Sequence, residues 1–190
     1  MSAITRAFLA LTLPKAMIEL AGDTQAELRS QHGDRDIRWV RPTNFHITLR
    51  FFGDLARPEL DRAGDLVKSL DGKIAAVSSG WSCVGAFPSM GRPQVIWLGL
   101  RDPAGSLELL AESINGALVS RGFGPADKPF KAHVTLGRVR RGHRVSLTGG
   151  SNRLTISGET FNIGTITLMK SLLTPQGPVY TPIETAQLSV

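Results

Sequence analysis

The chain has very few of the residues that build disulfide frameworks, zinc clusters or membrane spans. It contains one cysteine, Cys83, among 190 residues, which excludes an intramolecular disulfide and a cysteine-rich zinc site. Its longest uncharged apolar stretch, Ala7 to Pro14, is far shorter than the roughly 20 residues of a membrane-spanning helix. No small-residue cleavage site follows that stretch, as a signal peptide requires. We therefore expect a cytoplasmic protein with no membrane partner, in which Cys83 packs within a strand.

The composition is that of a globular protein with an excess of basic residues. Hydrophobic residues make up 42% of the chain and charged residues 20%, which fits one domain or two tightly joined lobes. There are 22 Lys and Arg against 16 Asp and Glu, a net charge of +6. Five arginines lie in one short stretch: Arg138, Arg140, Arg141, Arg144 and Arg153. Such a surface attracts nucleic-acid phosphates, but many basic proteins bind none, so charge alone does not decide the function.

Hydrophobic periodicity predicts a mixture of strands and helices. Helices are expected to begin at Pro14 and Pro58 and to cover Leu107 to Leu118, because apolar residues there recur at helical spacing. Strands are expected over residues 4–13, 38–40, 45–52, 74–86 and 94–100, and over most of the remaining chain. This alternation of helices and strands agrees with a globular domain of mixed class.

A nine-residue pattern occurs twice in the chain. Arg41-Pro42-x-x-x-His46-Ile47-Thr48-Leu49 recurs as Lys128-Pro129-x-x-x-His133-Val134-Thr135-Leu136, 87 residues later. The same offset places the strand and helix from Arg6 to Leu28 over those from Pro93 to Asn115. The repeat predicts a single bilobal domain over 1–190, with copies around 6–54 and 93–141 that face each other across a cleft.

Strand geometry places the histidine and threonine of each copy on one face. Alternate side chains of a strand point the same way, so His46 and Thr48 share a face while Ile47 points into the core. The same holds for His133 and Thr135. Two imidazoles can act as base and acid on a phosphodiester while two hydroxyls hold its non-bridging oxygens, and this chemistry needs no metal.

The pattern has a structural alternative, because a single histidine on a strand is usually a hydrogen-bonded structural residue. Two copies in one shared frame favour a site instead. The other histidines, His32 and His143, lie in polar segments and are expected to be solvated. Neither copy contains a carboxylate, and the chain has no His-Glu-x-x-His, Gly-x-Ser-x-Gly or Walker-type motif. Metal, serine-nucleophile and phosphate-loop chemistry are therefore disfavoured.

In order along the chain, these motifs resemble those of the two-histidine phosphoesterase superfamily, and within it the RNA 2′,3′-cyclic phosphodiesterases, once called 2′-5′ RNA ligases. The resemblance covers nearly the whole chain. Beyond the two His-x-Thr-x motifs it includes Arg38-Trp39-Val40-Arg41-Pro42, Phe51-Phe52-Gly53, and Phe87-Pro88 ahead of Val95-Ile96-Trp97-Leu98-Gly99-Leu100.

The resemblance implies a bilobal α+β fold with pseudo-two-fold symmetry, in which two antiparallel sheets line a central cleft and helices lie outside. It implies hydrolysis of a terminal 2′,3′-cyclic phosphate on RNA to a 2′-phosphate. Together with the metal-free chemistry of the two pairs, this leads us to expect a monomer that needs no cofactor. His46 would be the proton donor and His133 the proton acceptor. The substrate-binding residues that it implies are Thr48, Thr135 and Arg138 at the phosphate and Phe51 at the terminal base.

Phe51 and Arg138 occupy the same place in the two copies, five residues after the histidine. An odd spacing points away from the histidine face on a straight strand, so a bulge or bend is needed, and Gly137 permits one. Without it, Phe51 packs in the core and Arg138 is a solvated charge. Arg50 has the correct parity with His46 and is expected to line the cleft.

The chain departs from the family pattern at Ala132 and Gly137, where the resemblance implies proline and alanine, so a looser backbone is expected around His133. The segment Arg138 to Arg144 is either an RNA-backbone contact or a solvated loop. Three other functions stay open: 2′-5′ RNA ligation at the same site, non-catalytic RNA binding, and hydrolysis of small cyclic nucleotides or ADP-ribose cyclic phosphate.

Overall fold

The computed structural model describes residues 4–148 and 158–189, so Arg153 lies outside the described part of the chain. These described residues form three long helices and nine strands, and the expected α+β class is confirmed. The elements are β1 (Thr5–Thr12), α1 (Lys15–His32), β2 (Ile37–Trp39), the 3-10 turn η1 (Pro42–Asn44), β3 (His46–Leu55), α2 (Arg57–Leu70), β4 (Val77–Phe87), β5 (Val95–Arg101), α3 (Ser106–Val119), β6 (His133–Val139), β7 (Phe161–Ile163), β8 (Thr165–Thr174) and β9 (Gly177–Gln187).

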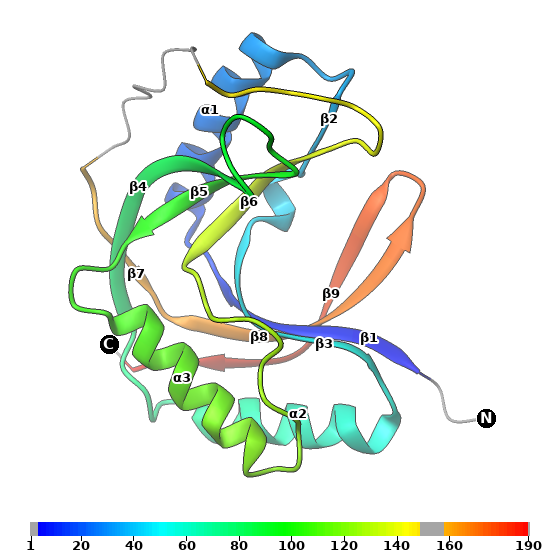
Figure 1. Ribbon diagram of the computed structural model, residues 1–190. Coiled ribbons are helices and arrows are strands. Elements are labelled where there is room, and N and C mark those ends of the chain that lie inside the picture. Colours follow the sequence, from blue (N-terminus) through cyan, green and yellow to red (C-terminus); the bar gives the residue numbers. More distant parts are fainter. Residues whose placement is uncertain (1–3, 149–157, 190) are drawn as a thin grey trace.

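The strands form one antiparallel path in the order β7-β4-β5-β6-β3-β1-β8-β9, with β2 beside β6. Two antiparallel sheets were expected. The structure has one continuous path of strands, which divides between β6 and β3 into two halves that correspond to these sheets. The ladder that joins them is a single pair, Ile47 with Val134. In Figure 1, α1 lies behind β5 and β6, while α2 and α3 lie beneath β1 and β3. The helices thus pack outside the sheet, as expected.

The ladder registers of the two halves match at the 87-residue offset. Leu11 pairs with Ile47 in one half, and Leu98 pairs with Val134 in the other. Between β1 and β3 the register shifts and leaves Leu49 as an extra residue. Between β5 and β6 it shifts at the equivalent place and leaves Leu136 as an extra residue. Each histidine strand therefore carries a bulge three residues after its histidine.

The core lies between the outer face of the sheet and the helices. Apolar side chains that alternate along the strands are fully buried there, including Leu9, Leu11, Ile47, Ile96, Leu98 and Val134. Because side chains alternate, the residues between them point to the opposite, open face. The strand pattern that fills the core therefore also determines which residues face the cleft.

Cys83 is exposed, so the expectation that it is a packed residue is wrong. It does lie in a strand, β4. The ladder between β4 and β5 shifts between Trp81 and Val84, which leaves Ser82 and Cys83 together opposite one residue. This bulge breaks the alternation that would have turned Cys83 inward. Within 4–148 and 158–189, no helix is long and apolar enough to cross a membrane.

Candidate active site

The four residues of the His-x-Thr pairs lie on one face of the sheet, around the junction of its halves. Ile47 and Val134 pair across β3 and β6, and both are fully buried on the core side. Their neighbours along each strand point the other way. His46, Thr48, His133 and Thr135 therefore face the same space, a cavity of about 480 Å³ that all four residues line. In an antiparallel pair this arrangement places the imidazoles on a diagonal, each across from the other strand's threonine.

Hydrogen bonds hold both imidazoles in the same tautomer. His46 Nδ1 lies 2.7 Å from the carbonyl oxygen of Asn44, and His133 Nδ1 lies 2.7 Å from that of Lys131. A carbonyl oxygen only accepts, so Nδ1 carries a proton in each ring. Nε2 is then the atom that can accept or release a proton. In His46 this nitrogen is 3.1 Å from the hydroxyl oxygen of Thr48.

Aromatic rings pack against both histidines. The ring of His46 lies 4.8 Å from that of Phe8 and 5.3 Å from that of Tyr180, measured between centroids. The ring of His133 lies 5.3 Å from that of Phe87. These contacts restrict the rotation of the imidazoles and remove water from their flanks. The aromatic rings and the backbone carbonyls hold each imidazole in place through its faces and its Nδ1, so that Nε2 is the nitrogen left to contact Thr48 in His46 or a ligand in the cavity.

The site lowers the pKa of both histidines. For His46 burial is the main cause, opposed by the hydrogen bond to Asn44 and assisted by the charges of His133 and Arg138. For His133 burial is again the main cause, and nearby Lys131 and Arg138 add to it. Burial and positive neighbours both disfavour the charged imidazolium. Both effects favour the neutral form of the two rings.

The bulges bring Phe51 and Arg138 into the cavity. The bulge at Leu49 reverses the alternation before Phe51, a residue that is 46% exposed, and the bulge at Leu136 does the same before Arg138. Both residues line the cavity with the histidines. The guanidinium of Arg6 stacks on Phe51, 4.8 Å from the ring centroid. We call the side of the cavity at Phe51 its aromatic end and the side at Arg138 its cationic end.

The expectation that Arg50 lines the cleft is wrong for the same reason. The bulge turns Arg50 to the core side, where it is 9% exposed. Its Nη2 donates hydrogen bonds of 2.7 Å to the carbonyl oxygens of Gly124 and Pro125, and its Nη1 lies 3.2 Å from Oδ1 of Asn115. Arg50 thereby ties β3 to the segment that follows α3.

The remaining histidines lie outside the cavity. His32 ends α1 and is half-buried. His143 is exposed, but its Nδ1 lies 2.7 Å from a carboxylate oxygen of Asp36, so it is paired as well as solvated. Of the basic segment Arg138 to Arg144, only Arg138 lines the cavity. Within the described ranges no three His, Cys, Asp or Glu side chains cluster as a metal site would require.

Several cavity residues were not assigned by sequence. Tyr180, on β9, is the chain's single tyrosine and packs against His46. Asn44 donates from Nδ2 to the carbonyl oxygen of Pro178 at 2.9 Å, which ties the β8–β9 hairpin to the turn before His46. The hairpin follows the repeat copies in the sequence, so no spacing signal connected it to the motifs. Arg38 and Arg41 also line the cavity.

Comparison with known proteins decides the family. A model described as LigT-like phosphoesterase matches the chain twice, over residues 11–97 and 98–180. The chain belongs to the LigT-like phosphoesterase family. The "RNA 2′,3′-cyclic phosphodiesterase" of Archaeoglobus fulgidus is 34% identical over 153 residues, 80% of this chain and 85% of that protein. The protein of the same name from Methanothermobacter thermautotrophicus is 30% identical, covering 96% of this chain and 98% of its own.

Solved structures agree with the fold of this LigT-like phosphoesterase. The crystal structure of TT0787 from Thermus thermophilus superposes with a TM-score of 0.78 at 28% identity, covering 96% of this chain and 97% of that one. LigT of Escherichia coli superposes with a TM-score of 0.72 at 22% identity over all of both chains. The resemblance inferred from the motifs is therefore confirmed at the level of family and fold.

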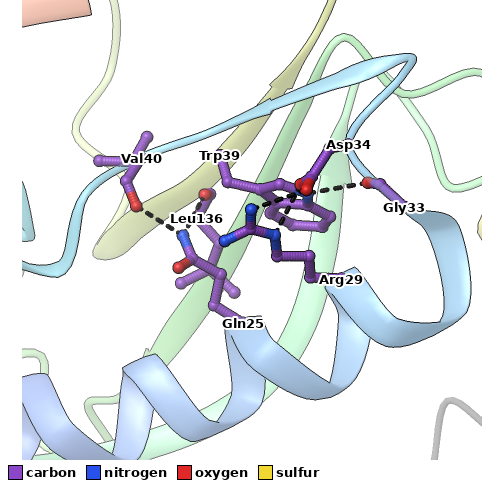
Figure 2. A network of polar contacts seen from close by, with 7 residues as sticks. All are labelled: Gln25, Arg29, Gly33, Asp34, Trp39, Val40 and Leu136. Carbon is purple, nitrogen blue, oxygen red and sulfur yellow. Dashed lines mark hydrogen bonds and ion pairs between the residues drawn. The ribbon is translucent and has the colours of Figure 1, made fainter.

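A buried polar network supports the second histidine strand of this phosphoesterase (Figure 2). Gln25 of α1 is 6% exposed, and its Nε2 donates 2.7 Å hydrogen bonds to the carbonyl oxygens of Val40 and Leu136. Leu136 is the extra residue of the β6 bulge, and it also accepts from Val40 N–H at 2.9 Å. The helix thus fixes the bulge that aims Arg138, and a close glycine contact assists it. A Cβ on Gly137 would lie 2.9 Å from atoms of Ile37 and Trp39, so the backbone here is closely packed rather than loose.

Titration should show the effect of burial on both histidines. In the protein without bound anion, we expect His46 and His133 to titrate below the usual pKa of 6.5, because burial disfavours the imidazolium. Inorganic phosphate should raise both pKa values, since an anion between the rings favours the charged form. Histidine NMR signals followed against pH, with sodium chloride at matched ionic strength as the control, check this. A pKa at or above 6.5 in the anion-free protein would contradict the expectation.

Replacement of Gln25 should weaken both fold and site. Gln25→Leu keeps an apolar body of similar size but removes two buried hydrogen bonds, so the free energy of unfolding should fall by about 1–3 kcal/mol. Activity should fall too, because the bulge at Leu136 directs Arg138. Gln31→Leu, on the exposed side of the same helix, is the matched control. Equal denaturant midpoints and equal activity in the two variants would show that the network supports neither.

Proposed function

We propose that this protein hydrolyses the terminal 2′,3′-cyclic phosphate of RNA to a 2′-phosphate, without a metal ion. The observation that carries the proposal is the diagonal pair of imidazoles, His46 and His133, whose Nε2 atoms border one cavity with two threonine hydroxyls. Hydrolysis of a phosphodiester needs one group to take a proton from water and another to give one to the departing oxygen. The names of the relatives, which match over most of this chain, agree with this activity.

The proposed reaction proceeds by attack of water on phosphorus. His133 Nε2 takes a proton from the water as its oxygen bonds to phosphorus. The bond from phosphorus to the 3′ oxygen breaks, and protonated His46 Nε2 gives its proton to that oxygen. The products are a 2′-phosphate and a 3′-hydroxyl. The assignment of acid and base follows the family resemblance, since two equivalent strands give each imidazole the same tautomer.

The remaining cavity residues stabilise charge and position the ligand. Thr48 and Thr135 lie beside the histidines and can donate hydroxyl hydrogen bonds to the non-bridging oxygens, and Arg138 supplies a positive charge. Phe51, exposed at the other end, offers a ring face for the terminal base. Tyr180 packs edge-on against His46 and holds its ring. The substrate charge favours protonation of His46, which burial alone disfavours.

Each catalytic histidine should be essential for turnover. His46→Ala and His133→Ala should each lower kcat by about 10²- to 10⁴-fold, because each removes one proton transfer. The measurement is the rate of 2′-phosphate formation from an oligonucleotide ending in a 2′,3′-cyclic phosphate. His143→Ala, outside the cavity, is the matched control and should retain the full rate.

The same assay separates the proposal from its alternatives. Chelators should leave the rate unchanged, and abolition by EDTA would contradict a metal-free mechanism. Retention of activity in both histidine variants would contradict the acid and base roles. Salt-sensitive RNA binding without turnover at any pH would instead indicate a binding module. Formation of 2′-5′ bonds from matched RNA ends would reveal ligation at the same site.

A further inference from the structure

The cationic end of the cavity has more positive charges than the single negative charge of one cyclic phosphate would neutralise. Four arginines line the cavity, Arg6, Arg38, Arg41 and Arg138, and none of its lining residues is acidic. Arg6 forms an ion pair with Asp54 and stacks on Phe51, so it belongs to the aromatic end. Within residues 4–148 and 158–189, no carboxylate forms an ion pair with Arg38, Arg41 or Arg138. Three guanidinium groups therefore face the cavity uncompensated.

Two of these arginines lie directly opposite each other. Arg38 of β2 and Arg138 of β6 are ladder partners, so their side chains leave the sheet on the same side. Like charges at such a pair are unfavourable, and neighbouring strands are only about 4.8 Å apart. Arg41 follows on the segment between β2 and η1 and is exposed to the same cavity. A bound anion beside the one held by Arg138 would relieve this repulsion.

The backbone that carries Arg38 and Arg41 is held in place by hydrogen bonds and by an ion pair at its start. As Figure 2 shows, Gln25 donates to Val40 O, and the indole N–H of Trp39 donates to Gly33 O at 2.9 Å. Arg29 pairs with Asp34 at the start of the same segment. The two arginines therefore extend from a fixed strand edge, which reduces the entropy lost when they bind a ligand. Arg140, Arg141 and Arg144 are equally exposed but do not line the cavity.

We propose that Arg38 and Arg41 form a second phosphate subsite, which takes the phosphate on the 5′ side of the terminal nucleoside. The inference rests on the proposed function, since it assumes that the cyclic phosphate lies between the histidines beside Arg138. On an RNA end, the nearest further anion is that 5′ phosphate. Guanidinium groups bind phosphate oxygens through paired, charge-assisted hydrogen bonds. The subsite makes the preferred substrate a nucleotide or chain end with a 5′ phosphate, rather than a nucleoside cyclic phosphate.

The test compares adenosine 2′,3′-cyclic phosphate with the same compound carrying a 5′ phosphate. In the unmodified protein, the 5′ phosphate should raise kcat/KM about tenfold or more, because hydrogen bonds to charged groups typically strengthen binding by at least that factor. In the double variant Arg38→Gln/Arg41→Gln, that ratio should fall toward one. Arg140→Gln/Arg141→Gln is the matched control of equal charge, and it should keep the original ratio. A ratio near one in the unmodified protein, or an unchanged ratio in the first variant, would overturn the subsite.

A binding experiment separates failure of the subsite from failure of the proposed function. If neither compound is hydrolysed and an oligonucleotide ending in a 2′,3′-cyclic phosphate is also left intact, the proposed function fails, and the subsite is then measured by calorimetry. The probes are adenosine 2′-phosphate and adenosine 2′,5′-bisphosphate. The second phosphate should tighten binding about tenfold or more to the unmodified protein and the control variant, but not to Arg38→Gln/Arg41→Gln. Equal tightening in all three proteins would show a diffuse charge effect and no subsite. Thermal unfolding checks that each variant is folded.

Discussion

The pairing of Ile47 with Val134 constrains the whole molecule. In the described chain it is the ladder contact that joins β3 to β6, and these residues are equivalent in the repeat. A two-fold relation between the halves therefore passes through this pair and places the two histidines diagonally across it. Both side chains are fully buried. A slip of one residue would expose them to the cleft and bury a histidine, so hydrophobic burial fixes the geometry of the candidate site.

The backbone of the two halves is repeated, but the side chains that it presents to the cavity differ. The bulges occur at equivalent places, yet the residue that each presents to the cavity is Phe51 in one half and Arg138 in the other. A nucleotide is itself asymmetric, with an apolar base at one end and charged phosphates at the other. In the proposed function, the two aligned histidines transfer protons at the centre, while the different residues at the bulges, Phe51 and Arg138, distinguish the ends of the ligand. The proposed subsite of Arg38 and Arg41 adds to this asymmetry, because it places a second phosphate at the end where Arg138 lies.

Much of the site could be predicted because the repeat is local and strictly spaced. Alternation along a strand assigned His46, Thr48, His133 and Thr135 to one face without any knowledge of tertiary contacts. The need for a bulge also followed from parity. The spacing of the residues did not show where the bulge lies. It lies at Leu49, one residue before Arg50, and it turns the Arg50 side chain into the core. Cys83 was misplaced for the same reason, since bulges depend on pairing between strands that sequence alone does not show. Tyr180 comes from a hairpin outside the repeat and had no spacing signal.

Burial of both imidazoles is compatible with the proposed acid and base roles, because a phosphate ligand would supply the negative charge that favours protonation. Arg138 is one of the charges that lower the pKa of His46 and of His133. A phosphate bound to Arg138 offsets that positive charge and adds a negative one next to both rings, so binding favours protonation twice over. Only one proton is needed, and two nearby imidazolium groups repel each other, as the effect of His133 on the pKa of His46 shows. The bound anion therefore favours the singly protonated pair, which is the state that can give one proton and take another.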